Sequence, residues 1–144
     1  MIDNTKLLYF NTIVSEVGSL VPLEFLRQIP FVAKRIYYIY GVPGNVIRGF
    51  HSHRLLKQVL ICIHGRVKIK VKTPYSEDVV ELNKPNIGLY IGHMVWREMY
   101  DFSEDAVLIV LASEYYSEDD YIRDYGSYTK EAIEYFKNKG EKYK

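Results

Sequence analysis

The segment from Arg66 to Lys72 alternates strictly between cationic and β-branched residues. Successive side chains of a β-strand point to opposite faces, so its three branched residues are expected in a core and its four cations in water. Comparable short runs recur along the chain, separated by turns that contain Gly, Pro or Asn. They lie near residues 6–10, 31–40, 46–53, 57–64, 66–72, 79–82, 87–100 and 107–111. About eight such strands predict an all-β fold, either a sandwich of the jelly-roll kind or a β-barrel.

The length and the local signals predict one domain over residues 1–144. His64-Gly65 stands between two strand-like runs and is expected to form a tight hairpin. Helical signals occur only near the C-terminus, where Ser117–Asp120 can cap a helical turn and residues 129–139 carry acids early and lysines late. Gly140 is expected to end that short helix.

The balance of charges argues against several classes of partner. With 19 basic and 18 acidic residues the net charge is +1, so no global field favours nucleic acid or an anionic membrane. No apolar run reaches the ~20 residues that span a bilayer, and the N-terminus lacks the features of a secretory signal, which predicts a cytoplasmic protein. The single cysteine, Cys62, excludes an internal disulfide and a Cys-based zinc site, and its apolar neighbours place it in the core.

The segment Arg48-Gly49-Phe50-His51-Ser52-His53 carries the clearest chemical signal. Residues two apart on a strand share a face, so His51 and His53 are expected to point into one space. Two imidazoles that converge inside a small β-barrel indicate metal binding or proton transfer, whereas a pair on an exposed edge would have no function. Arg48 is expected to face the opposite side unless Gly49 marks a bulge that brings it round.

Metal binding is disfavoured by the residues at two later positions. Metal-binding cupins join a His-X-His pair to a nearby Glu and to a His on a later strand, and these positions hold Gln58 and Arg97 here. A guanidinium has no lone pair for a metal, and neutral Gln is a poor replacement for a carboxylate. His93 does not restore the site, because on a strand it would share the face of Arg97. The sequence therefore predicts that no metal is bound.

Without a metal, paired histidines beside an arginine suit proton transfer next to a carbonyl group. Removal of a carbon-bound proton leaves an enediolate, whose negative oxygen Arg97 or Arg48 could stabilise. Arg35 and Tyr37 share a face of their strand, which suits the phosphate or a hydroxyl of a nucleotide sugar, or equally a surface arginine beside a core tyrosine. Trp96 is either a core residue or a stacking surface, and the neighbouring arginine favours the pocket.

The chain resembles the sugar 3,4-ketoisomerases, cupins that act on thymidine diphosphate (dTDP) 4-keto-6-deoxyglucose, over residues 6–125. The likeness rests on the runs FVAKRIYYIYGVPGNVIRGFHSHRLLKQVLICIHGRVKIKV, LYIGHMVWREMYDFS and LASEYYSEDDYIRDY. It implies a cupin-like jelly roll that moves the keto group from carbon 4 to carbon 3 without metal or organic cofactor. It also implies a homodimer that exchanges an N-terminal strand, and a place in making 3-amino-3,6-dideoxy sugars for bacterial surface glycans such as lipopolysaccharide or S-layer glycan.

The same resemblance implies a role for each candidate residue. His51 would be the base and His53 its partner, or the proton donor at carbon 4, although the choice of base stays open. Tyr37 would supply a pocket hydroxyl. The residues expected to hold the substrate are Arg35, Arg48, Gln58 and, as a stacking surface, Trp96. Arg97 would act near carbon 4 and is histidine in some members, which favours a product of gluco configuration. His93 stands where a proline is expected, with no predicted consequence.

Three other functions remain open. A dTDP-sugar 3,5-epimerase also removes a proton beside the ketone, but its family uses a His–Asp dyad with an opposing Tyr, and no Asp is evident beside His51 and His53. A non-catalytic cupin would bind dTDP tightly without converting any 4-keto sugar. A metal-dependent oxygenase would purify with stoichiometric iron.

Overall fold

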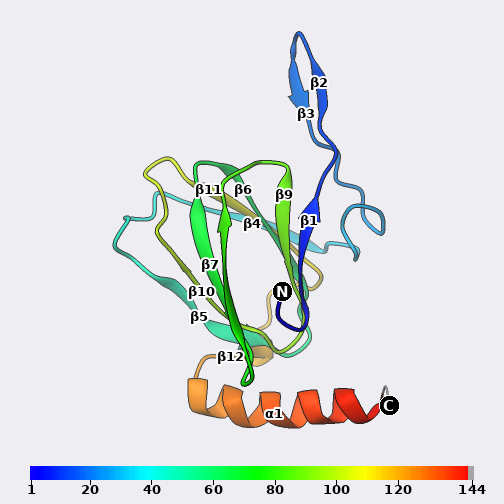
Figure 1. Ribbon diagram of the computed structural model, residues 1–144, viewed down its shortest axis with the longest axis vertical. Coiled ribbons are helices and arrows are strands. Elements are labelled where there is room, and N and C mark those ends of the chain that lie inside the picture. Colours follow the sequence, from blue (N-terminus) through cyan, green and yellow to red (C-terminus); the bar gives the residue numbers. More distant parts are fainter. Residues whose placement is uncertain (143–144) are drawn as a thin grey trace.

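The computed structural model describes residues 1–142, in which most of the regular structure is β-strand (Figure 1). The strands are β1 (Thr5–Tyr9), β2 (Ile13–Ser15), β3 (Gly18–Leu20), β4 (Arg35–Tyr40), β5 (Arg48–His53), β6 (Gln58–His64), β7 (Val67–Lys72), β8 (Glu77–Leu82), β9 (Ile87–Ile91), β10 (Trp96–Tyr100), β11 (Val107–Ala112) and β12 (Tyr121–Ile122). A 3-10 turn, η1 (Glu118–Asp120), precedes β12, and the helix α1 (Tyr125–Lys142) follows it.

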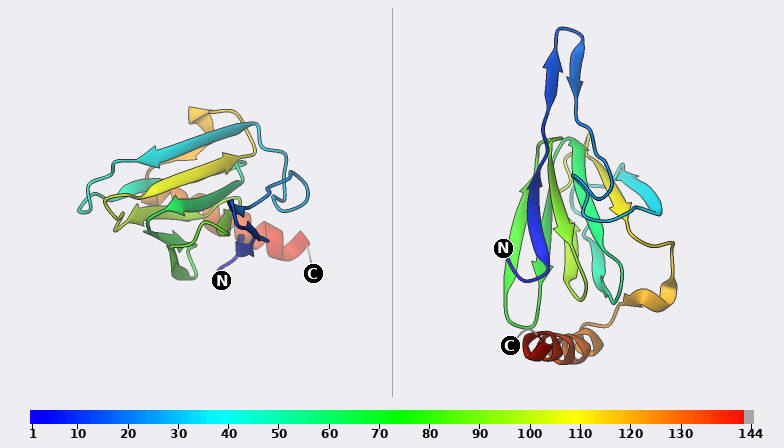
Figure 2. Two further views of the ribbon diagram at one scale, coloured as in Figure 1. Left: turned by 90° about the horizontal axis from the view of Figure 1, so that it is seen from above. Right: turned by 90° about the vertical axis from the view of Figure 1, so that its right-hand side faces the viewer.

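Two five-stranded antiparallel sheets make up the body of the molecule. One has the strand order β1-β9-β6-β11-β4 and the other β12-β5-β10-β7-β8. They pack face to face, as Figure 2 shows, and the hairpin β2–β3 projects beyond one end of the sandwich while α1 crosses the other. The predicted all-β, cupin-like class is confirmed, as two packed sheets rather than a closed barrel among the described residues.

The core lies between the two sheets and follows the alternation that the sequence displays. Val67, Ile69 and Val71 of β7 are fully buried, whereas the lysines between them are partly exposed. Each such aliphatic side chain contributes about 1.5–3 kcal/mol when it leaves water. Cys62 is buried among these residues, as predicted. A second apolar cluster around Ile29 covers the outer face of the first sheet.

The structure corrects the predicted hairpin at His64-Gly65. The turn exists, and Gly65 adopts a φ of +73°, but β6 pairs with β9 and β11 while β7 pairs with β8 and β10. The turn therefore carries the chain from one sheet to the other. A turn signal in the sequence reports that the chain reverses, not which neighbours the next strand finds. Residues 87–100, expected as one strand, form β9 and β10 with a turn between them.

The helix α1 is longer than the predicted segment 129–139. It begins at Tyr125, because the Asp124 carboxylate accepts hydrogen bonds from the Ser127 backbone N–H (2.8 Å) and hydroxyl (3.0 Å), and it continues past Gly140. Tyr128 anchors it to the sheets: its side chain is fully buried, with the hydroxyl 2.9 Å from the Met94 carbonyl oxygen. Within residues 1–142, no helix combines the length and apolarity needed to cross a membrane.

Candidate active site

The imidazoles of His51 and His53 lie side by side on β5, as the alternation of the strand predicts. Their ring centroids are 4.9 Å apart and the rings meet edge to face. Tyr121 of β12 packs against both, at 5.0 Å from His51 and 4.3 Å from His53. His53 is 1% exposed and His51 partly buried, so the alternative of two idle histidines on an exposed edge does not hold.

A bulge in β5 brings Arg48 to the same side as His51. Arg97 of β10 lies opposite His51 and Glu98 lies opposite Gly49, so one extra residue of β5 is left between the two registers. Gly49 has a φ of +99°, outside the range that residues with side chains favour. Arg48 and His51 consequently line one cavity, which the regular strand geometry would forbid.

Replacing Gly49 with alanine is expected to disrupt this bulge. A Cβ there would lie 2.8 Å from the Arg97 carbonyl oxygen, and the positive φ adds backbone strain. We expect the free energy of unfolding in urea to fall by about 1–3 kcal/mol. Gly41→Ala is the matched control, because its φ is +68° but a Cβ would meet nothing within 4 Å. Equal losses in the two variants would show that the close approach to β10 contributes nothing.

Two cavities meet at these histidines. The first, of about 400 Å³, includes His53, Leu55, Leu56 and Asp120 in its lining. The second, of about 370 Å³, includes in its lining Tyr37, Arg48, His51, Met99 of β10 and Arg123, which directly follows β12. Both cavities share Arg35, Tyr116 and Tyr121.

The hydrogen bond of His51 determines which of its nitrogens is free. Its Nδ1 lies 3.0 Å from the Gly49 carbonyl oxygen, which can only accept. Nδ1 therefore carries the proton and Nε2 keeps a lone pair. Burial, together with the Arg97 charge, lowers the pKa of His51 to about 3, and the same two causes lower the pKa of His53. Both imidazoles are neutral at pH 7.

Arg97, Gln58 and Tyr37 form a hydrogen-bonded chain behind the histidines. The Arg97 guanidinium, 2% exposed, donates to the Gln58 amide oxygen and to the Val95 carbonyl oxygen (3.1 Å). The Gln58 amide donates in turn to the Tyr37 hydroxyl (2.9 Å). Burial lowers the pKa of Arg97 to about 10, so it remains a cation at pH 7, and burial raises the pKa of Tyr37. Gln58 and Arg97 line neither cavity, so they act on the site from behind.

Comparison with known proteins matches residues 3–133 to one family, FdtA, described as WxcM-like, C-terminal. The chain belongs to the FdtA family. The TDP-4-oxo-6-deoxy-alpha-D-glucose-3,4-oxoisomerase of Aneurinibacillus thermoaerophilus is 45% identical over 125 residues, which are 87% of this chain and 90% of that protein. The predicted sugar 3,4-ketoisomerase family is confirmed.

Solved structures of FdtA-like enzymes share the whole architecture. The 3,4-ketoisomerase QdtA of Thermoanaerobacterium thermosaccharolyticum, crystallised as a His-to-Asn mutant in complex with TDP-4-keto-6-deoxyglucose, is 52% identical. Its TM-score is 0.91, over 93% of this chain and 97% of that chain. The WlaRB TDP-quinovose 3,4-ketoisomerase of Campylobacter jejuni is 43% identical with a TM-score of 0.87, over 90% of this chain and 99% of that chain.

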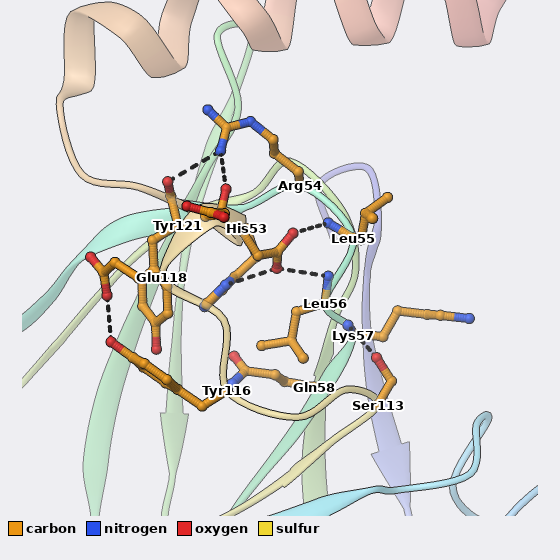
Figure 3. Close-up of polar contacts among 12 residues, drawn as sticks. His53, Arg54, Leu55, Leu56, Lys57, Gln58, Ser113, Tyr116, Glu118 and Tyr121 are labelled. Atoms are coloured by element: carbon orange, nitrogen blue, oxygen red, sulfur yellow. Dashed lines mark hydrogen bonds and ion pairs between the residues drawn. The ribbon is translucent and has the colours of Figure 1, made fainter.

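The site includes a carboxylate that the sequence analysis missed. Asp120, in η1, places its Oδ2 3.2 Å from Nδ1 of His53 (Figure 3). The argument against an epimerase, that no Asp accompanies the histidines, is therefore wrong. Asp120 follows His53 by 67 positions, and Ser117–Asp120 signalled only the helical turn, which the structure contains. Tyr121, which contacts both rings, was also missed, because it is similarly far from the histidines along the chain.

Two predicted residues lie elsewhere than expected. Trp96 is 3% exposed and packs on α1, with its ring centroid 5.5 Å from that of Tyr128, and it lines neither cavity. It is a core residue. Neighbouring side chains on a strand point to opposite faces of the sheet, and because Arg97 points toward Gln58 and the histidines, Trp96 points toward α1. His93 lies in the turn before β10, so the strand argument about its face does not apply.

Arg35 takes the position that the sequence predicts, beside Tyr37. Its guanidinium carbon lies 5.2 Å from the Tyr37 ring centroid and 5.7 Å from that of Tyr116. A cation held between two aromatic rings at the junction of the cavities is suited to an anionic ligand. No group of three or more His, Cys, Asp or Glu side chains suited to a metal ion occurs among the described residues.

Proposed function

We propose that this FdtA-family protein is a dTDP-4-keto-6-deoxyglucose 3,4-ketoisomerase that works by proton transfer between imidazoles and the sugar. The observation that carries the proposal is the pair of adjacent, neutral, buried histidines, with Nε2 of His51 free to accept a proton. The activities for which its relatives are named supply the substrate. Neutral imidazoles beside a permanent cation suit removal of a proton next to a ketone.

The reaction returns every group to its starting state. His51 takes the proton from carbon 3, and the electrons of that C–H bond form the C3–C4 double bond while the carbon-4 ketone becomes an enediolate oxygen. The Arg97 charge, the Tyr37 phenol and Arg48 favour that anion. His51 gives its proton to the carbon-4 oxygen. His53 takes the hydroxyl proton from the carbon-3 oxygen and delivers it to carbon 4, so the ketone now stands at carbon 3.

Incubation with dTDP-4-keto-6-deoxyglucose in D₂O, followed by NMR, tests the proposal. We expect a 3-keto product with deuterium at carbon 4, and we propose the gluco configuration there from the presence of Arg97. A 4-keto product with deuterium at carbons 3 and 5 would identify an epimerase. Tight binding of dTDP with the sugar unchanged would identify a binding protein without this activity.

We also propose that the protein is a homodimer in which the N-terminal segment reaches the partner subunit. The hairpin β2–β3 stands away from both sheets (Figure 1) and exposes four apolar side chains: Ile13, Val14, Val17 and Leu20. Val17, at its tip, is 97% exposed, an unfavourable place for valine in a monomer. Light scattering is expected to give twice the chain mass, and half that mass for Val17→Glu. A cytoplasmic location, one domain over residues 1–144 and supply of a 3-keto sugar to an aminotransferase stay predictions.

A further inference from the structure

The carboxylate of Asp120 is a fixed part of the site rather than a mobile surface group. Its Oδ1 accepts a hydrogen bond from the Leu55 backbone N–H (2.7 Å) and its Oδ2 one from that of Leu56 (3.1 Å). Its own carbonyl oxygen accepts the Arg54 backbone N–H (3.1 Å). Three contacts thus hold η1 against the loop that follows β5, whose residues Arg54 to Lys57 are labelled beside His53 in Figure 3.

The same carboxylate lies beside the His53 ring. Its Oδ2 lies 3.2 Å from Nδ1, although not in line for a hydrogen bond, and neither ring nitrogen has a hydrogen-bond partner within residues 1–142. A buried N–H without an acceptor is costly, so a small rotation of the ring that aligns Nδ1–H with Oδ2 is favourable. A carboxylate can only accept, which places the proton on Nδ1 and leaves the lone pair on Nε2.

The two imidazoles then differ in the kind of acceptor behind them. His51 has the neutral Gly49 carbonyl oxygen, whereas His53 has an anion. The Arg97 charge opposes protonation of both rings. The carboxylate beside His53 is an anion that can stabilise its cation while a proton is in transit, whereas His51 has only a neutral carbonyl oxygen behind it.

We propose that Asp120 is a positioning residue that keeps His53 in the Nδ1–H form and stabilises it while it carries the proton from the carbon-3 hydroxyl to carbon 4. The inference rests on the proposed function and assigns the two half-reactions to different histidines. His51 opens the reaction at carbon 3, and His53, supported by Asp120, completes it at carbon 4. Loss of the carboxylate would therefore slow proton delivery to carbon 4 and leave proton removal from carbon 3 largely unchanged.

Asp120→Asn tests this division of labour. In Asn an NH₂ group replaces one of the two carboxylate oxygens, so one of the two loop N–H groups loses its acceptor and no negative charge remains beside His53. With dTDP-4-keto-6-deoxyglucose in D₂O, we expect formation of the 3-keto product to fall by about 10²- to 10⁴-fold while exchange of the carbon-3 proton persists. By ¹⁵N NMR we expect His53 to be in the Nδ1–H form in the wild type and to lose that preference in Asp120→Asn.

Ser113→Ala is the matched control for damage to the loop. The Ser113 hydroxyl accepts the Lys57 backbone N–H (2.9 Å) in the same loop without contacting His53. This variant should keep the wild-type ratio of exchange to product formation and the His53 tautomer. The inference would be overturned if the wild type converts the sugar and Asp120→Asn keeps both the wild-type ratio of exchange to product formation and the wild-type tautomer of His53. A wild type that converts nothing would overturn the proposed function, and the ¹⁵N spectra would still confirm or refute the role of Asp120.

Discussion

His51→Asn is expected to abolish exchange of the carbon-3 proton with solvent and to lower turnover by about 10⁴-fold, the upper end of the range for a general base. Nε2 of His51 is the free lone pair, since Nδ1 faces the Gly49 carbonyl oxygen. The Asn amide nitrogen can still donate to that carbonyl oxygen, so the bulge in β5 should persist, but an amide has no basic nitrogen. The measurement is deuterium incorporation from D₂O, followed by NMR.

The control for this variant is His64→Asn, which changes an exposed histidine at the end of β6 that lines neither cavity. It should exchange the carbon-3 proton at the wild-type rate. If His51→Asn also exchanges at that rate, His51 is not the base and the assignment passes to His53. Unfolding curves for both variants show whether any lost activity reflects lost folding.

The second large effect concerns stability in mild acid. His51 and His53 have pKa values far below 6.5 in the folded protein, that of His51 about 3, because burial and the Arg97 charge disfavour their cations. Below pH 6.5 the unfolded chain binds two protons that the folded chain does not, so the free energy of unfolding falls as the pH falls. Between pH 7 and pH 5 we expect a loss of about 3–4 kcal/mol from these two groups.

Urea unfolding at half-unit steps of pH measures this loss. His51→Asn removes one of the two groups and should roughly halve the slope between pH 6 and pH 4, whereas His64→Asn should leave it unchanged. A wild-type stability that stays constant from pH 7 to pH 5 would contradict the buried, neutral state of the pair. Above about pH 8 both histidines are neutral in the folded and in the unfolded chain, and the dependence disappears.

What was predictable from the sequence rests on local rules. The alternation of β7 and the shared face of His51 and His53 follow from the two-residue period of any strand, whatever it pairs with. The possible bulge at Gly49 was also visible in the sequence, because a glycine inside a strand often marks a bulge, and a bulge there would bring Arg48 to the face of His51. The same two-residue period places the side chains of Trp96 and Arg97 on opposite faces of β10. The sequence therefore already argued against a pocket role for Trp96 once Arg97 was placed on the inner face.

The sequence by itself determined the strand pattern, the family motifs and the two histidines, because each depends on residues close together along the chain. Only the tertiary structure decided that β6 and β7 join different sheets, that Gln58 links Arg97 to Tyr37, and that Asp120 meets His53. The side-chain contacts join residues between 21 and 67 positions apart. They form because packing two sheets and a helix around one core brings distant loops together, and no spacing in the sequence encodes that distance.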